Sequence, residues 1–230
     1  MHRFILPLTA AAVLATACSS PGPALTSSGG ESAQSSTDVD RGRAAAPPTV
    51  AGGAIGKQWA AAPPMTIDPD KKYEATLKTA QGDIVISLLP KDAPIAVNSF
   101  VFLARQGYYE NVPVHRIVKG FVIQSGDPTG TGTGGPGYTI KDEKVSLEYD
   151  RGTLAMARTP APNSAGSQFF ITLASLAGRL PKDYVIFGRV TKGMDVVDKI
   201  AATEVKRGPG GEVSSPTSPI AIDNIVIVES

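Results

Sequence analysis

Cysteine, histidine and tryptophan are all scarce in this chain of 230 residues, which has one cysteine, two histidines and one tryptophan. The cysteine is Cys18 and one of the histidines is His2, so both lie near the N-terminus. A disulfide framework needs several cysteines, and a Cys/His metal site needs clustered ligands. The composition therefore excludes both kinds of site.

An excess of charge of one sign is also lacking. The 22 lysines and arginines nearly balance the 21 aspartates and glutamates, which gives a net charge of +1. Proteins that bind nucleic acid normally show a clustered basic surface, because affinity comes largely from phosphate contacts. No such cluster occurs in the sequence, so we expect no nucleic-acid partner.

The first residues have the pattern of an export signal. His2 and Arg3 precede an apolar run of fourteen residues, Phe4 to Ala17, which is too short to span a bilayer as a helix. The following Ala15-Thr16-Ala17-Cys18 resembles the lipobox of bacterial lipoproteins, in which the cysteine is lipidated after cleavage, although alanine replaces the usual leucine three positions before it. We predict a signal peptide at 1–17 and lipidation of Cys18. The alternative is ordinary cleavage near Ala17 without a lipid.

Residues 18–64 are rich in Ala, Ser, Gly and Pro and show no helical or strand period, which predicts a flexible linker. About 45 such residues have a root-mean-square reach of roughly 40 Å. Trp59 lies in this stretch, and we expect it to pack loosely on the domain or on nothing. The folded domain is predicted at 65–230.

Alternating apolar residues begin after Lys71. The runs Tyr73 to Leu77 and Asp83 to Leu88 flank Gln81-Gly82 and predict a β-hairpin. A helix is predicted after Pro90, with Asp92 as its cap, Pro94 in its first turn and Gly107 at its end.

A second helix is predicted at 194–202 and a closing strand at 225–228. Many short strands with only two helices indicate a closed or nearly closed β-barrel that is capped at its ends.

The segment from Tyr109 to Gly126 contains Arg116, Phe121 and Gln124. In an uninterrupted strand these three side chains cannot share one face, so a bend at Lys119-Gly120 is required to bring them together. Their spacing resembles the cyclophilin signature.

Two further segments resemble the same family. Residues 152–172 contain Leu-Ala-Met-Ala and Gly-Ser-Gln-Phe-Phe, and 185–190 read Val-Ile-Phe-Gly-Arg-Val. Together the three motifs cover about 75–228. The resemblance implies a mainly β fold, a closed antiparallel eight-stranded barrel capped by two α-helices, and peptidyl-prolyl cis/trans isomerase activity that needs no cofactor and no metal.

The resemblance also assigns the site. It implies that Arg116 faces the prolyl nitrogen, that Phe121 helps to form the proline pocket and that Gln124 holds the substrate backbone. These three are the expected catalytic residues. The expected substrate-binding residues are Val122, Ala157, Arg158, Gln168, Phe170, Leu180 and Tyr184.

Three departures from the family pattern affect this assignment. Val122 stands where methionine is common, Arg158 stands where asparagine is common, and the loop from Phe170 to Phe187 is one residue longer than in the best-known members. Counting through that loop gives Gly178 or Arg179 at the place of a tryptophan that contributes to tight cyclosporin binding in the family. We therefore expect weak cyclosporin binding.

Other interpretations of single features are less favoured. Residues 130–135 fit Gly-x-Gly-x-x-Gly, but Pro136 follows where a helix should begin, so we predict a flexible loop. His115 is expected to be a hydrogen-bonded structural residue, because isomerisation needs no base. A serine hydrolase would need a suitable histidine and a nucleophile elbow, and the case for one is weak.

The sequence thus predicts an exported monomer, anchored by Cys18 to the outer side of the cell membrane, that isomerises proline-containing segments of other proteins in the cell envelope. The alternative is a cyclophilin fold that binds such segments, or acts as a holdase, with little turnover.

Overall fold

The structure is a computed structural model that describes residues 57–208 and 210–230. Cys18, the predicted signal peptide and most of the predicted linker lie outside the described residues. The elements, in chain order, are β1 (Tyr73–Thr79), β2 (Gly82–Leu88), α1 (Pro94–Arg105), β3 (Val112–Pro113), β4 (Arg116–Val118), β5 (Val122–Ser125), β6 (Thr153–Met156), β7 (Phe169–Thr172), β8 (Ile186–Lys192), α2 (Met194–Ala201), β9 (Val205–Arg207), β10 (Val213–Pro216) and β11 (Ala221–Glu229).

The predicted hairpin is confirmed as β1 and β2, which pair antiparallel from Glu74↔Ser87 to Thr79↔Gly82. Every second residue of each strand is buried, as the alternation of apolar residues requires. At the turn Gly82 has a φ of +130°, a backbone conformation that residues other than glycine rarely adopt. The Thr79 hydroxyl donates to the Gly82 carbonyl at 2.7 Å and closes the turn.

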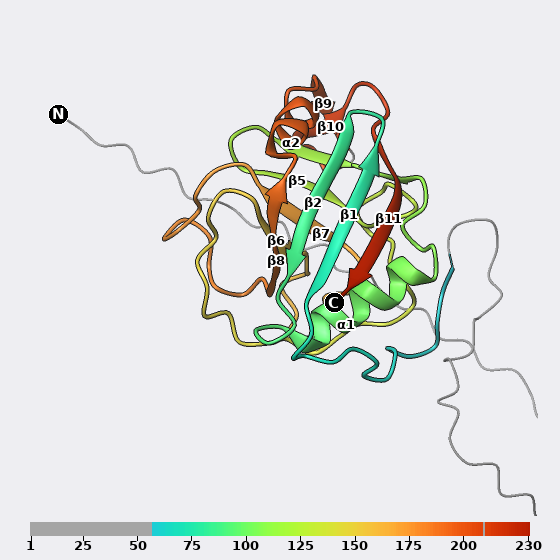
Figure 1. The fold of residues 1–230 in the computed structure, drawn as a ribbon. Helices are drawn as coiled ribbons and strands as arrows, with labels where there is room; N and C mark the ends of the chain where they lie inside the picture. The colour runs from blue at the N-terminus through green and yellow to red at the C-terminus, as the bar shows by residue number, and fades with distance from the viewer. Residues whose placement is uncertain (1–56, 209) are drawn as a thin grey trace, which may run out of the picture. The chain divides into compact units, whose positions relative to one another are not determined.

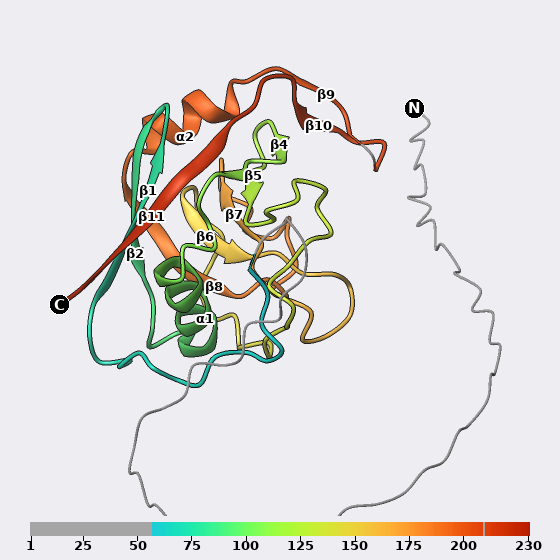
Figure 2. The same ribbon diagram turned by 90° about the vertical axis from the view of Figure 1, so that its right-hand side faces the viewer.

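Nine strands form one antiparallel sheet in the order β3-β11-β1-β2-β8-β6-β7-β5-β4. The sheet curls into a half-barrel (Figures 1 and 2), and its end strands β3 and β4 are not paired with each other. The expected closed barrel of eight strands is therefore wrong: the barrel is open, and its sheet has nine strands. β9 and β10 form a separate two-stranded sheet.

Pro113 lies at the gap between β3 and the β4–β5 hairpin. It has no N–H to donate across the gap, and the N–H of Val114 donates to Ile220 at 2.9 Å, just before β11. The Pro113 carbonyl accepts from the Ser125 hydroxyl at 2.9 Å. A side chain of β5 thus contacts β3, but no backbone ladder joins them.

The helices cover opposite ends of the curled sheet (Figures 1 and 2). The second helix is predicted correctly within one residue. Helix α1 begins at Pro94 as expected, but its N-cap is Ala93, which offers no side-chain cap, and the prediction of Asp92 is wrong. Glu143, from a distant loop, takes that role: its two carboxylate oxygens accept the N–H groups of Ile95 at 2.8 Å and Ala96 at 2.9 Å.

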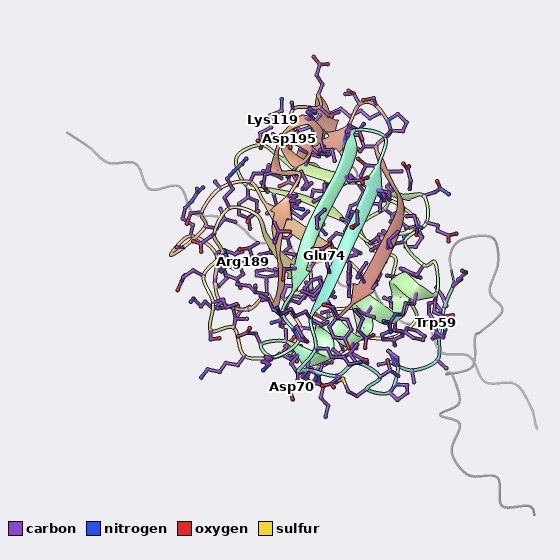
Figure 3. The ribbon with its side chains drawn as sticks, in the orientation of Figure 1. Trp59, Asp70, Glu74, Lys119, Arg189 and Asp195 are labelled. Atoms are coloured by element: carbon purple, nitrogen blue, oxygen red, sulfur yellow. The ribbon has the colours of Figure 1, made fainter. Side chains whose placement is uncertain are left out.

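Trp59 is part of the folded core, so the expectation that it packs loosely is wrong. Its side chain is only 3% exposed and lies beside α1 (Figure 3). The indole contacts Phe102 and Tyr108, with ring centroids 5.3 and 5.9 Å away. Its backbone N–H donates to Pro136 at 2.8 Å. The segment around Trp59 therefore ties the loop at 133–139 to α1.

The sheet separates two hydrophobic clusters. The larger one fills the curl between the sheet and the two helices and includes Phe100, Phe169 and Phe187. The smaller one lies on the opposite face, and its buried members are Val122, Tyr149, Ala155, Phe170, Leu176 and Ile186. The candidate site is built on the smaller cluster.

Candidate active site

The β4–β5 hairpin brings together the three residues expected to act in catalysis. Arg116 pairs with Gln124 across the hairpin, and the turn between the strands contains Gly120 with a φ of +70°. The N–H of Phe121 donates to Val118 at 2.9 Å and closes this turn. The bend predicted at Lys119-Gly120 is therefore present.

These residues line one cavity of about 270 Å³. Nine of the ten predicted site residues form its wall: Arg116, Phe121, Val122, Gln124, Ala157, Arg158, Phe170, Leu180 and Tyr184. Gln168, the tenth, does not line it and instead hydrogen-bonds to Gln124. Because Leu180 and Tyr184 reach the same cavity as Phe170, the longer loop does not displace them from the site.

The floor of the cavity is apolar. Val122 and Phe170 are 2% and 5% exposed, and the Phe170 ring meets the Tyr184 ring edge-on at 5.6 Å between centroids. The Tyr149 hydroxyl holds the Tyr184 backbone, donating to its carbonyl at 2.9 Å and accepting its N–H at 3.1 Å. The floor is thus a preformed surface that can receive a small apolar ring.

A chain of hydrogen-bonded side chains forms the polar wall. Arg116 Nη1 donates to Gln124 Oε1 at 3.4 Å, and Gln124 Nε2 donates to Gln168 Oε1 at 3.0 Å. Gln168 Nε2 in turn donates to the carbonyls of Gly132 and Gly134 at 3.0 and 2.9 Å. Each amide has both ends engaged, so its orientation is fixed.

The loop that ends this chain wraps around a buried carboxylate, Asp127. Its oxygens accept the N–H groups of Thr129, Gly132 and Gly134 at 2.7 to 3.0 Å. A Cβ on Gly134 would lie 2.0 Å from Asp127 Oδ1, so only glycine fits there. Burial opposes ionisation of Asp127, but these hydrogen bonds and that of the Thr129 hydroxyl outweigh it and lower its pKa. The sequence predicts the loop but gives no sign of the carboxylate that shapes it.

Arg116 has a second partner that the sequence does not indicate. Its Nε donates to Glu212 Oε2 at 2.7 Å and its Nη2 to Glu212 Oε1 at 2.9 Å. Glu212 lies between β9 and β10, 96 positions further along the chain, so no local pattern connects the two. The hydrogen bonds from Arg116 lower the pKa of Glu212 and keep it ionised.

A sequence model of one family, described as cyclophilin type peptidyl-prolyl cis-trans isomerase/CLD, matches residues 75–227. The chain belongs to the cyclophilin-type isomerases. The match includes the three sequence motifs and all of the cavity wall.

Individual cyclophilins agree with this assignment. A peptidyl-prolyl cis-trans isomerase of Helicobacter pylori is 40% identical over 154 residues, which cover 60% of this chain and 93% of the relative. An isomerase of Arabidopsis thaliana is 44% identical over 139 residues, 57% of this chain and 82% of the relative.

A crystal structure of a cyclophilin-type isomerase from Cryptosporidium parvum, obtained in the presence of the dipeptide Ala-Pro, superposes with a TM-score of 0.63 at 38% identity, and the match covers 68% of this chain and 99% of the other. The chain is thus a peptidyl-prolyl cis-trans isomerase of the cyclophilin type.

Arg158 lines the cyclophilin cavity but is engaged by the protein itself. Its side chain is 14% exposed, and its guanidinium donates to the carbonyls of Thr159, Ala161 and Asp183 at 3.2, 2.8 and 3.1 Å. It therefore ties the loop after β6 to the loop before β8. Its contribution to substrate binding remains a prediction.

His115 lies next to Arg116. Both of its ring nitrogens are buried and neither makes a well-aligned hydrogen bond, so the prediction of a hydrogen-bonded residue is not confirmed. Burial lowers its pKa, against the opposing effects of Asp127 and of the Pro113 backbone, so the ring is neutral near pH 7.

A second, larger cavity of about 950 Å³ adjoins the first and shares Gln124, Ala157 and Arg158 with it. The residues of the Asp127 loop form one part of its wall, and Gln58 with 60–62 form another. The segment 57–74 precedes the residues that match the family. Sequence analysis did not predict that this segment reaches a cavity of the site.

Within 57–208 and 210–230, no helix combines the length and apolarity needed to cross a membrane. The same residues contain no group of three or more His, Cys, Asp or Glu side chains placed to hold a metal ion.

Proposed function

We propose that this cyclophilin accelerates rotation about X-Pro bonds in exported or cell-envelope proteins, and that a lipid on Cys18 anchors it to the outer side of the cell membrane. One observation carries the catalytic part of the proposal: the guanidinium of Arg116, whose Nη1 is not bound by Glu212, stands at the edge of a cavity with an apolar floor. The relative from Cryptosporidium parvum, whose structure was obtained with Ala-Pro, supports proline-containing segments as the substrate.

The chemistry needs only binding and one hydrogen bond. Rotation about the amide bond has a barrier of roughly 18 to 20 kcal/mol, because the nitrogen lone pair is delocalised into the carbonyl. In the twisted state the lone pair returns to the nitrogen, where a guanidinium N–H of Arg116 can bind it. Each ~1.4 kcal/mol gained in that state alone speeds the reaction about tenfold.

The remaining residues bind and orient the substrate. Phe121, Val122 and Phe170 hold the prolyl ring and exclude water, while Gln124 and Gln168 bind the peptide backbone beside it. The carbonyl before the proline then swings while the ring stays in place. No nucleophile or proton relay takes part, which agrees with the neutral, unengaged ring of His115.

A protease-coupled assay with a peptide that contains Ala-Pro tests this part. We expect turnover that saturates with peptide. Binding of the peptide with no acceleration of isomerisation would contradict the proposal and favour a binding module or holdase.

The location rests on the sequence of residues 1–64, with its apolar start, the lipobox-like Ala15-Thr16-Ala17-Cys18 and the Ser/Gly/Pro-rich linker. Mass spectrometry of the membrane fraction should find the mature N-terminus at an acylated Cys18, and Cys18→Ser should release or mislocalise the protein. Native protein with an unmodified N-terminus downstream of Cys18 would disprove the anchor. Peptide turnover serves as the control, because it should be equal in both forms.

A further inference from the structure

We propose that Glu212 is a positioning residue that holds the guanidinium of Arg116 in the orientation used for catalysis. This inference rests on the role of Arg116 given above. It adds to the site an acidic residue that lies outside the cavity wall and outside the three sequence motifs.

Glu212 and Arg116 form a bidentate ion pair. Glu212 binds Nε at 2.7 Å and Nη2 at 2.9 Å, which are the donors on one edge of the guanidinium plane. Two parallel charge-assisted hydrogen bonds fix both the position and the plane of an arginine. A single contact would leave the plane free to turn, and a lysine would have no plane to fix.

The ion pair with Glu212 leaves the Nη1 atom of Arg116 on the cavity side. Nη1 is not used by Glu212 and points toward Gln124, which lines the cavity with it. The substrate therefore does not have to displace Glu212 to reach an N–H group. A residue that blocks the site would occupy the donors that the substrate needs. Glu212 leaves Nη1 to the substrate, so its geometry is that of a positioning residue.

The backbone at Glu212 is held by the β9–β10 hairpin. The Glu212 carbonyl accepts the N–H of Gly208 at 2.8 Å across the end of the hairpin, and Val213 pairs with Arg207 directly after it. At the base of the hairpin the Thr217 N–H donates to Glu204 at 2.8 Å. β10 lies against β4, the strand that carries Arg116. We call the β9–β10 hairpin the hairpin arm, because it places an acidic side chain beside the catalytic arginine.

Arg116 is then fixed from two directions. On one side the Asp127 loop holds Gln168 and, through it, Gln124, and on the other side the hairpin arm holds Glu212. Without Glu212 only the long contact of 3.4 Å to Gln124 would orient the guanidinium. We therefore expect loss of the carboxylate to slow catalysis with little effect on folding.

The test compares Glu212→Ala, Glu212→Gln and the control Glu204→Gln in the full-length chain. Glu204 is exposed and is on the same arm, and the described contacts place no part of its side chain on Arg116. An exposed ion pair of good geometry is worth up to about 1 kcal/mol, so Glu212→Ala should lower kcat about 3- to 5-fold with KM nearly unchanged. Glu212→Gln should fall between, since its amide keeps one acceptor. Glu204→Gln should equal the wild type.

A double-mutant cycle distinguishes positioning from a general structural role. In an Arg116→Ala background, measured at raised enzyme concentration, Glu212→Ala should cause no further loss, because there is no guanidinium left to orient. An equal loss in both backgrounds, an unchanged kcat in Glu212→Ala, or a rise in kcat would each overturn the proposal. If Glu212→Ala folds poorly, the near-isosteric Glu212→Gln carries the same cycle.

The pH profile gives an independent readout. Protonation of Glu212 at a pH below the ordinary range of a glutamate should reduce the wild-type kcat to that of Glu212→Gln, and the variant should lack this step. The failure of the two proposals can be told apart. If Arg116→Ala keeps its turnover, the assignment of Arg116 is wrong; if only Arg116→Ala loses turnover, the inference about Glu212 alone is wrong.

Discussion

The two faces of the curled sheet are built from the same strands but perform different tasks. Neighbouring residues in a strand point to opposite faces, so each such pair contributes one member to the large cluster and one to the small cluster. The pairs are Phe169 and Phe170, Leu154 and Ala155, Ile123 and Val122, and Phe187 and Ile186. The large cluster is covered by two helices, whereas the small one opens into the cavity.

The comparison shows how stability and function are kept apart within four short strands. Side chains of the large cluster are packed in the interior, so they contribute mainly to the free energy of folding. Those of the small cluster leave part of their surface for a ligand. A shift of one residue in the register of β7 would exchange Phe169 and Phe170 and damage both tasks at once. The alternation that buries residues under the helices therefore also determines which residues of the same strands line the cavity.

The largest effects are expected from truncating Phe169 and Phe170, which are adjacent in the chain but point to opposite faces of the sheet. Phe169 is 2% exposed and packs against Phe100 and Tyr109 at 5.6 and 5.7 Å between ring centroids. Phe169→Ala should therefore lower the free energy of unfolding by about 3 to 5 kcal/mol. Phe170→Ala should cost less stability, because its ring already borders a cavity, but should lose most of the peptide turnover. Urea unfolding and turnover per folded molecule measure the two effects, and equal losses of stability in both variants would contradict the division.

Removing the side chain of Arg116 tests the face that lines the cavity. Arg116→Ala should reduce turnover of an Ala-Pro peptide about 100- to 1,000-fold, the usual effect of losing one donor to a transition state. Its melting temperature should change little, because the lost ion pair with Glu212 is partly exposed. Arg116→Lys should restore little activity, since an ammonium lacks the planar fork. Turnover close to that of the wild type would show that the assignment is wrong.

The rim of the cavity offers a test through an inhibitor. Leu180 lines the cavity, while Gly178 and Arg179 before it are exposed, and the chain's tryptophan is buried elsewhere. The lack of an indole at this rim should cost roughly 2 to 4 kcal/mol in cyclosporin binding, about 30- to 1,000-fold in affinity.

The variant Arg179→Trp should recover much of that affinity with little change in turnover. Titration of the drug against isomerase activity measures both quantities. Nanomolar inhibition of the natural chain, or no gain in the variant, would argue against this position of the rim.

The smallest expected effect concerns His115, which lies in the connection between β3 and β4. Burial lowers its pKa in the folded chain, so the unfolded chain takes up the proton first as the pH falls. Its contribution to stability is thus complete above the unfolded value near 6.5 and decreases as the pH falls through that value toward the folded pKa. The stability lost between pH 7.5 and 5.5 should be smaller in His115→Gln than in the wild type. Turnover should be nearly the same in both, and a large loss in the variant would reveal a catalytic role.

The sequence predicts the parts of this molecule that are encoded locally. The β1–β2 hairpin follows from alternation around Gln81-Gly82, and helix α2 from its apolar period. The nine cavity residues follow from three motifs that resemble those of the family, one of which contains the bend at Gly120. Each of these features is encoded within a short segment of the chain.

The errors share the opposite property. Glu143 caps α1 from 47 or 48 positions away, and Glu212 reaches Arg116 from 96. Trp59 is buried by residues that follow it by more than forty positions. Whether the sheet closes depends on how β3 and β5 meet in space, which the alternation within each strand does not determine. Long-range partners of single side chains leave no pattern in one sequence.

The pairing of β1 with β11 makes the completion of the fold depend on residues that are synthesised long after β1. Tyr73 pairs with Glu229, and the carboxylate of Glu229 binds both Lys71 and Arg105. About 140 residues separate the end of β1 from the start of β11, which a ribosome needs roughly 7 to 28 s to add at 5 to 20 residues per second. During that time β1 has an open edge that can pair with another chain. This isomerase thus has a slow interval in its own folding, which ends only when β11 is available.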